Sequence, residues 1–191
     1  IIASLVKQNV KNVEHQYVYS SDLDLLQLTD EKTSIIKPQN GSKPDLIFTP
    51  KEVHEKYELY PNQITDYKGL HGDSSDNLKG VPKVGKKTAT KLLNEFNNLE
   101  TIYENLNTLT PKMQENFINN KDQAFLCKKL ATLIDNLETP SLENLSYREI
   151  KTQDLKKYFS MLELNKAKVL LDRLIDSQPE MQSQRSQDSL F

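Results

Sequence analysis

The chain has 191 residues, with 27 acidic and 25 basic side chains and a net charge of −2. This length is sufficient for one domain with a sizeable core, and 36% hydrophobic with 27% charged residues indicates a polar, water-soluble protein. The single cysteine, Cys127, excludes an internal disulfide and any cysteine zinc site. We expect Cys127 to be buried on a helix face. A single cysteine also fits a protein in a reducing compartment, so we expect the protein to be cytoplasmic. No apolar run reaches membrane length, and no signal peptide is evident.

The N-terminal part of the chain has the pattern of an α/β domain. It begins at Ile1, in the middle of a helical pattern, so we expect a piece of a longer protein. The aromatic residues of the first predicted strand are expected to be buried. The elements predicted here are a helix over 1–9, strands over 16–20, 33–36 and 46–48, a helix from the capping box at Thr49 to about Tyr57, and a helix from Pro61 toward Gly69.

The rest of the chain has only helical patterns, followed by a polar tail. After Ser177 the sequence is rich in Ser, Gln and Glu, which predicts a disordered tail. Apolar residues recur at spacings of three and four over 85–96, 99–106, 111–119, 121–133, 152–159 and 165–176.

Four aspartates form two pairs. Asp22 and Asp24 follow the first predicted strand, at the kind of strand end where open α/β sheets build sites, and Asp73 and Asp76 precede a glycine-bounded turn. Carboxylates in such clusters suit Mg²⁺ or Mn²⁺, which lower the pKa of a water that attacks a phosphodiester. The alternative is that Asp22 caps the following helix and Asp73 caps a turn, which is the commoner role of aspartates at such positions.

The turn Gly80–Gly85 opens a predicted helix whose exposed N–H groups and dipole favour an anion. There is no acidic residue between Lys79 and Lys91, and Gly85 lets a phosphate approach the backbone. The pattern predicts sequence-independent, salt-sensitive binding to a nucleic-acid backbone; the alternative is an ordinary helix start with a solvated lysine face. The residues expected to contact DNA are Gly80, Val81, Lys83, Gly85, Lys86, Lys87 and Thr88.

Residues 72–77 and 80–89 together resemble the 5′→3′ exonuclease domain of bacterial DNA polymerase I, within the flap endonuclease family. Residues 21–28 are similar to that family's strand-end segment, usually Gly-Asp-Lys-Asp before an apolar helix. The resemblance runs from Ile1 to about Ile175, and no departure from the family pattern removes a carboxylate. The departures are Ser21 for glycine, Leu23 for lysine, Leu78-Lys79 for Ile-Pro, and Lys83 for glycine.

This resemblance implies an α/β fold: a parallel-sheet, PIN-like nuclease portion followed by an all-helical helix-3-turn-helix portion that binds DNA. The expected division is residues 1–71 for the α/β part, 72–176 for the helical part and 177–191 for the tail. It also implies a monomeric, metal-dependent nuclease that removes 5′ ends or flaps during replication and repair. The aspartates matching its second-metal ligands are Asp22, Asp24, Asp73 and Asp76.

The resemblance implies no catalytic residue apart from these metal ligands, and it implies a potassium ion at the turn. In the family, a Glu-Ala-Asp-Asp segment directly precedes the helix that resembles residues 1–5. That segment contributes to the first metal site and is absent from this chain, so we expect at most residual nuclease activity from this sequence alone. The alternative is a non-catalytic module that binds duplex DNA through the turn.

The C-terminus adds an expected partner. The last five residues resemble the bacterial sliding-clamp pentapeptide, in which glutamine is followed three and four residues later by Leu-Phe. A short peptide in a disordered tail can dock two apolar side chains into a groove. The clamp-binding residues are expected to be Gln187, Leu190 and Phe191.

Overall fold

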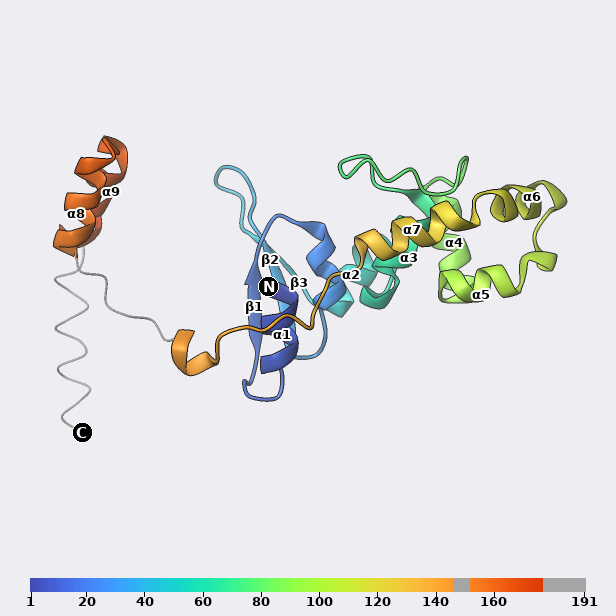
Figure 1. Ribbon diagram of the computed structural model, residues 1–191, viewed down its shortest axis with the longest axis horizontal. Helices are drawn as coiled ribbons and strands as arrows, with labels where there is room; N and C mark the ends of the chain where they lie inside the picture. Colours follow the sequence, from blue (N-terminus) through green and yellow to red (C-terminus); the bar gives the residue numbers. More distant parts are fainter. Residues whose placement is uncertain (146–151, 177–191) are drawn as a thin grey trace. The chain divides into compact units, whose positions relative to one another are not determined.

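The computed structural model describes residues 1–145 and 152–176 and forms two compact units, Ile1–Pro140 and a second that begins at Ser141 (Figure 1). No helix within the described ranges has the length and apolar character to cross a membrane. The elements of the first unit are α1 Ile2–Asn9, β1 Gln16–Tyr19, η1 Leu23–Leu28 (a 3₁₀ helix), β2 Thr33–Lys37, β3 Leu46–Phe48, α2 Pro50–Tyr57, η2 Pro61–Gln63, α3 Ile64–His71, α4 Lys86–Phe96, α5 Leu99–Glu104, η3 Leu106–Thr108, α6 Pro111–Asn119 and α7 Lys121–Ala131.

The fold is mixed α/β, rich in helix, with one small sheet of order β1-β2-β3. β1 and β2 are parallel, as predicted, and Tyr17 lies opposite Ser34. The prediction of a parallel sheet is wrong for β3, which pairs antiparallel to β2 with Ile36 opposite Ile47. Residues 38–45 are too few for the crossover connection that a parallel partner needs, whereas a short turn suffices for an antiparallel one.

The expectation that β1 is a buried aromatic strand is also wrong. Tyr17 and Tyr19 are 64% and 65% exposed, and only Val18 between them is buried. Successive side chains of a strand point to opposite faces, so a strand that covers the core on one side alone exposes every second residue.

Local sequence signals account for the predicted helices. Thr49 and Glu52 form the predicted capping box at the start of α2, with Pro50 in the first helical position. α3 begins after the turn opened by Pro61, and α4 begins directly after Gly85. The apolar spacing beyond residue 85 thus predicted every helix from α4 to α7, although α5 and α7 end two residues earlier than expected.

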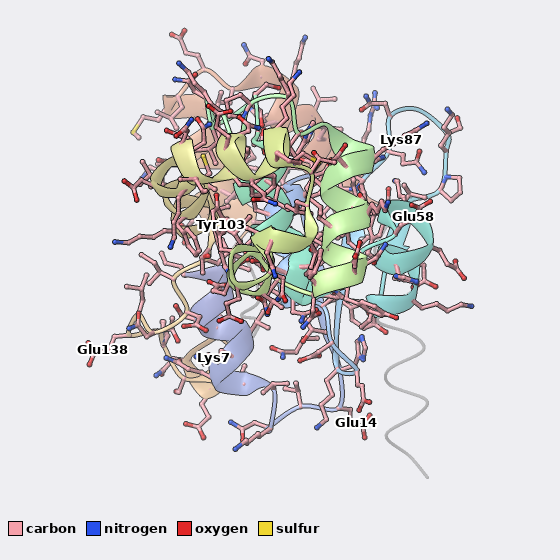
Figure 2. The ribbon with its side chains drawn as sticks, turned by 90° about the vertical axis from the view of Figure 1, so that its right-hand side faces the viewer. Lys7, Glu14, Glu58, Lys87, Tyr103 and Glu138 are labelled. Atoms are coloured by element: carbon pink, nitrogen blue, oxygen red, sulfur yellow. The ribbon has the colours of Figure 1, made fainter. Side chains whose placement is uncertain are left out.

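The first unit has two hydrophobic clusters, and Tyr57 packs against both of them. The smaller one lies under the sheet. The larger one lies among the helices, around Tyr103 in Figure 2. The sheet cluster consists of Val18, Leu25, Leu26, Ile35, Phe48, Val53 and Ile64, and the helical cluster includes Leu59, Leu70, Val81, Val84, Ala89, Leu92, Leu93, Leu99, Ile102, Phe117 and Ala124.

Helices α3 and α7 pack closely against each other. A side chain on Gly69 would meet the Ala124 carbonyl oxygen at 2.9 Å, so glycine is what lets the two helices approach. Beside this contact the buried Asp66 carboxylate pairs with Lys128 at 2.6 Å and accepts the Leu99 N–H at 2.8 Å. Cys127 of α7 is fully buried, as predicted.

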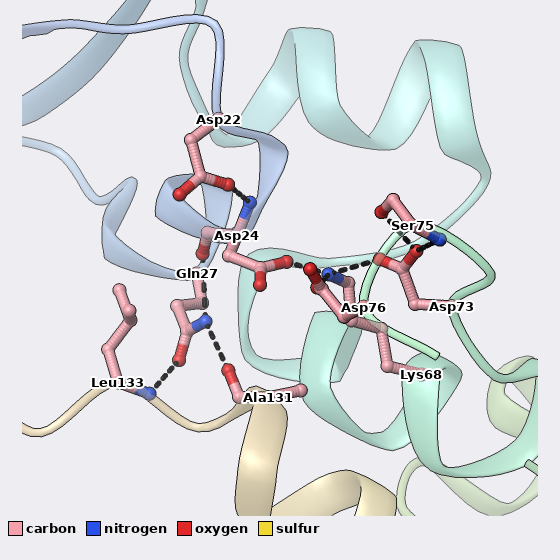
Figure 3. Close-up of polar contacts among 9 residues, drawn as sticks. All are labelled: Asp22, Asp24, Gln27, Lys68, Asp73, Ser75, Asp76, Ala131 and Leu133. Atoms are coloured by element: carbon pink, nitrogen blue, oxygen red, sulfur yellow. Dashed lines mark hydrogen bonds and ion pairs between the residues drawn. The ribbon is translucent and has the colours of Figure 1, made fainter. Parts of the chain in front are cut away.

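The chain after α7 returns along the sheet half of the unit. The amide of Gln27 donates to the Ala131 carbonyl at 3.0 Å and accepts the Leu133 N–H at 3.0 Å (Figure 3). Further on, the segment that carries Glu138 runs beside α1, where Lys7 pairs with Asp135 at 2.7 Å (Figure 2). These contacts join the two hydrophobic clusters into one unit.

In the second unit, η4 covers Leu142–Leu145, and α8 Thr152–Met161 packs against α9 Asn165–Asp176. An ion pair between Lys156 and Asp172, at 2.5 Å, joins these two helices. The tail at 177–191, with the predicted clamp-binding residues Gln187, Leu190 and Phe191, lies outside the described residues. The predicted boundary at residue 71 stays a prediction.

Candidate functional site

The first aspartate pair lies where β1 ends and η1 begins. The Asp22 carboxylate accepts a hydrogen bond from the Asp24 N–H at 2.9 Å and caps η1, which is the alternative role that its position predicted. Asp24 turns its carboxylate toward α3 and forms an ion pair there with Lys68 (Figure 3). The two aspartates of this segment therefore have different surroundings.

The second pair lies in a short loop after α3. Asp73 and Leu78 form an isolated antiparallel bridge with two backbone hydrogen bonds of 2.8 Å. One Asp73 oxygen accepts the N–H of Ser75 at 2.9 Å and its hydroxyl at 2.5 Å, so Asp73 also has its alternative role in a turn. The other oxygen remains available and faces Lys68.

Lys68 lies at the centre of these carboxylates. Its ammonium pairs with Asp24, with Asp73 at 2.6 Å and with Asp76 at 3.7 Å (Figure 3). Three of the four predicted metal ligands thus converge on one point, and Asp22 does not take part in this cluster. We call Asp24, Asp73, Asp76 and Lys68 the acidic cluster.

The charges in the acidic cluster perturb one another. The Lys68 ammonium, assisted by Ser75, lowers the pKa of the Asp73 carboxyl to about 2. Burial raises the pKa of Asp24 and outweighs the opposite effect of Lys68. Burial by itself would lower the pKa of Lys68, but its hydrogen bonds to Asp24 and Asp73 raise it. Lys68 therefore remains protonated. Its single positive charge is smaller than the total negative charge of the three carboxylates around it when these are ionised.

The backbone approaches itself closely at Gly72 and Gly80, between the acidic cluster and the predicted phosphate-binding turn. We call this close approach the Gly72–Gly80 crossing. Gly72 and Gly80 both have positive φ, and a side chain on Gly80 would lie 2.4 Å from the Gly72 nitrogen. Beyond the crossing, Val81 donates its N–H to Leu70 at 2.8 Å, and the buried Val81 and Val84 anchor the turn in the helical cluster. The loop of Asp73 and the turn after Gly80 therefore have fixed positions relative to each other.

The outward face of the turn is polar and positively charged. Lys83, Lys86 and Lys87 are exposed, and Gly85 caps α4 without any side-chain hydrogen bond to its first N–H groups. Exposed N–H groups and the helix dipole favour an anion at such a helix start. Lys83 has φ of +64°, a left-handed conformation that glycine adopts more readily than lysine.

Two cavities lie beside these residues and were not predicted. One of about 360 Å³ lies between the turn and α6, where Asn116 donates to the Pro82 carbonyl at 2.7 Å and Lys112 faces the same space. The other, of about 240 Å³, adjoins the acidic cluster and is lined in part by Tyr67 and His71. Lys68 was missed as well, because a lysine in the last turn of a helix normally extends into solvent.

The part of the chain that the structure describes contains no three His, Cys, Asp or Glu side chains arranged so that they could hold a metal ion. The donor type of the acidic cluster is nevertheless the one that hard cations prefer, since carboxylate oxygens surround the Lys68 ammonium, although their present arrangement is not that of a metal site. The assignment of Asp22, Asp24, Asp73 and Asp76 as metal ligands stays a prediction.

Comparisons with known proteins agree with the fold and the motif. The family described as "5'-3' exonuclease, C-terminal SAM fold" matches residues 59–153. DNA polymerase I of Bacillus subtilis is 37% identical over 192 residues, covering 100% of this chain and 22% of that protein. The 5'-3' exonuclease of Halalkalibacterium halodurans is 36% identical over 135 residues, covering 69% of this chain and 44% of that protein.

Among solved structures, the bacteriophage T5 flap endonuclease in a pseudo-enzyme–product complex with DNA and metal ions has a TM-score of 0.61 and 22% identity. The alignment covers 68% of this chain and 47% of that one, and at this identity it shows the fold alone. The chain thus spans less than half the length of these relatives. Together the comparisons show that the chain belongs to the 5'-3' exonuclease family and is related to bacterial DNA polymerase I.

Proposed function

We propose that this chain is part of a metal-dependent 5′→3′ exonuclease or flap endonuclease, which hydrolyses phosphodiester bonds of DNA in replication and repair. The observation that carries the proposal is the Gly72–Gly80 crossing, because it holds the carboxylates of Asp73 and Asp76 directly beside the turn that is suited to a phosphate. A DNA backbone bound at the turn would then lie next to a cation-binding centre.

Asp24, Asp73 and Asp76 would hold Mg²⁺ or Mn²⁺, with Asp22 as the fourth predicted ligand. A bound divalent ion would lower the pKa of an attacking water and stabilise the leaving oxygen. The T5 flap endonuclease complex contains metal ions, which supports metal dependence without identifying the metal. What the described residues contribute is a partly buried, net negative centre, in which each carboxylate has one oxygen near Lys68.

The proposed DNA-binding element is a helix-3-turn-helix formed around Gly80–Gly85, with its lysines and the free N–H groups of α4 facing the phosphates. The potassium ion that the motif's resemblance implies belongs to this same turn. Alanine at Lys83, Lys86 and Lys87 together should weaken duplex binding equally for all sequences. The log–log dependence of affinity on salt should flatten by roughly 0.9 for each phosphate that the variant no longer neutralises. A defect confined to certain sequences would contradict backbone recognition.

The test of the enzyme is cleavage of a labelled 5′-flap substrate by the intact gene product that contains this chain. We expect cleavage that requires Mg²⁺ or Mn²⁺ and is abolished by Asp73→Asn. The matched control is Asp154→Asn, an exposed aspartate in the first turn of α8, which should cleave like wild type. Full activity of Asp73→Asn would remove the metal assignment.

A second candidate, a non-catalytic module that binds duplex DNA, is favoured by one observation. Asp22 and Asp73 both make the cap and turn hydrogen bonds that a purely structural aspartate makes, and Lys68 partly neutralises the rest. Under this reading the intact gene product binds the flap substrate in Mg²⁺ but leaves it uncleaved. The cleavage assay therefore separates the two candidates.

A bacterial sliding clamp is the proposed protein partner, bound by a monomer through the C-terminal residues. Deletion of Leu190 and Phe191 should abolish co-purification with the clamp, whereas deletion of Gln178 and Pro179, in the same tail, should not. Unchanged clamp binding after the first deletion would contradict this partner.

A further inference from the structure

The centre of the acidic cluster is occupied by a side chain of the protein itself. The Lys68 side chain is only 12% exposed, although lysines at the end of a surface helix are usually solvated. Its ammonium contacts carboxylates from two segments far apart in the sequence, Asp24 of η1 and the Asp73–Asp76 loop (Figure 3). Lys68 therefore links η1 to this loop by charge.

The oxygens that hold Lys68 are the oxygens that a divalent cation would need. Asp73 has one oxygen engaged by Ser75, so the oxygen that contacts Lys68 at 2.6 Å is its available donor. The Asp24 oxygen that pairs with Lys68 is buried. A divalent ion and an ammonium group cannot share these two oxygens at coordination distance, since their like charges would be only a few ångströms apart.

We propose that Lys68 is a built-in counter-ion that competes with the divalent metal for Asp24 and Asp73, so that its ammonium leaves the cluster as the metal enters. Lys68 then stabilises the metal-free protein by relieving repulsion among the carboxylates, and it lowers the affinity of the site for metal. This inference rests on the proposed metal dependence and adds to it a residue that sets metal affinity.

The surroundings provide a place for the displaced side chain. The cavity of about 240 Å³ beside the cluster is lined by Lys68 itself, by Tyr57 and by Tyr67. An ammonium over an aromatic face is stabilised, so the proposed exchange takes the Lys68 side chain from the carboxylates into this space by a change of rotamer.

The first test measures binding of Mn²⁺ alone to the full chain by electron paramagnetic resonance. Lys68→Met, which keeps the length and removes the charge, should bind Mn²⁺ on the order of tenfold more tightly than wild type, a coupling typical of two ligands that compete. Lys43→Met, at an exposed loop position, changes the net charge equally and should bind like wild type. Equal or weaker binding by Lys68→Met would overturn the proposal.

A second measurement uses the unmodified protein, so it does not depend on whether a variant folds. Acetylation of lysines by acetic anhydride, followed by mass spectrometry, should label Lys68 slowly without metal and several-fold faster in saturating Mn²⁺. Lys43 serves as the internal reference and should not change. An unchanged or slower rate at Lys68 would mean that the ammonium does not leave, and would overturn the proposal.

These outcomes are distinct from those of the cleavage assay. If the intact gene product cleaves flaps in a metal-dependent way but Lys68→Met shows no gain in Mn²⁺ affinity, the proposed function stands and the competition is wrong. If Mn²⁺ binds and displaces Lys68 while no cleavage occurs, the competition stands and the enzyme assignment is wrong.

Discussion

The acidic cluster and the glycine-bounded turn lie on either side of one backbone crossing, yet they are held in place by different forces. Ion pairs hold the cluster, and Asp76, its outermost member, is 53% exposed. Backbone contact and buried valines hold the turn, with Val81 only 2% exposed. The geometry of the cluster therefore depends on charge, whereas the geometry of the turn depends on backbone packing.

The largest expected effect is at the crossing. Gly80→Ala places a methyl group 2.4 Å from the Gly72 nitrogen and forces a left-handed φ of +59° on alanine. We expect a loss of roughly 3 kcal/mol or more in the free energy of unfolding, measured by urea denaturation, because backbone atoms cannot move aside as side chains can.

Gly85→Ala is the matched control for this substitution. A side chain at Gly85 would meet no atom within 4 Å, and its φ is −82°. We expect the free energy of unfolding to change by less than about 0.5 kcal/mol, while DNA affinity falls if a phosphate does approach this residue. An equal loss of stability in both variants would show that the crossing is not what fixes the turn.

A smaller effect is expected in the acidic cluster. Asp73→Asn weakens the 2.6 Å pair with Lys68, a charge-assisted hydrogen bond whose loss should lower the free energy of unfolding by about 1.5–3 kcal/mol. The same urea experiment measures it. If Asp73→Asn destabilises the protein more than Gly80→Ala does, charge and not backbone packing is the dominant constraint.

The pH dependence follows from the same residue. The pKa of Asp73 is about 2 in the folded protein, below its ordinary value of 3.8, so the folded state binds fewer protons than the unfolded state. Its contribution to stability is complete above the ordinary value and is lost as the pH falls toward 2. The raised pKa of Asp24 acts in the opposite direction, favouring the folded state at low pH and opposing it once Asp24 is ionised.

Urea denaturation at a series of acidic pH values should therefore show a steeper loss of stability in wild type than in Asp73→Asn. Parallel curves for the two proteins would contradict the assignment of the lowered pKa to Asp73.

Apart from the Gly85 control, the smallest effect is expected at Lys83. Its left-handed φ strains a non-glycine residue by about 1–2 kcal/mol, and glycine's greater entropy in the unfolded chain offsets roughly 0.5–1 kcal/mol of that. Lys83→Gly should thus raise the free energy of unfolding by up to about 1.5 kcal/mol, while reducing the salt dependence of DNA binding. Lys83→Ala should lose the same charge without gaining stability.

Much of the fold could be predicted because its signals are local. The capping box at Thr49, the proline at residue 61 and the apolar spacing of α4 each determine an element within a few residues. The direction of β3 was mistaken because the parallel sheet was inferred from the family resemblance, whereas the short connection before β3 favours an antiparallel pair. The exposure of Tyr17 and Tyr19 depends on how many layers cover the sheet, which no local pattern determines.

The candidate site was predicted only in part, because only some of its signals are local in the sequence. The aspartates were found by their spacing, yet whether a carboxylate caps its own helix, as Asp22 does, or reaches another segment, as Asp24 does, depends on tertiary packing. Lys68 lies five residues before Asp73 and has no distinguishing neighbours in the sequence. It became evident only when α3 was placed against η1.

The Gln27 side chain has a consequence for how the protein folds. Its hydrogen bond to Ala131 joins residues 104 apart, so this contact forms only when the end of α7 lies against η1. Contacts of such sequence separation slow folding and make it cooperative, because a large loop must close before they form. We therefore expect residues 1–140 to fold in a single kinetic phase, with the sheet and helices α4–α7 acquiring their structure together.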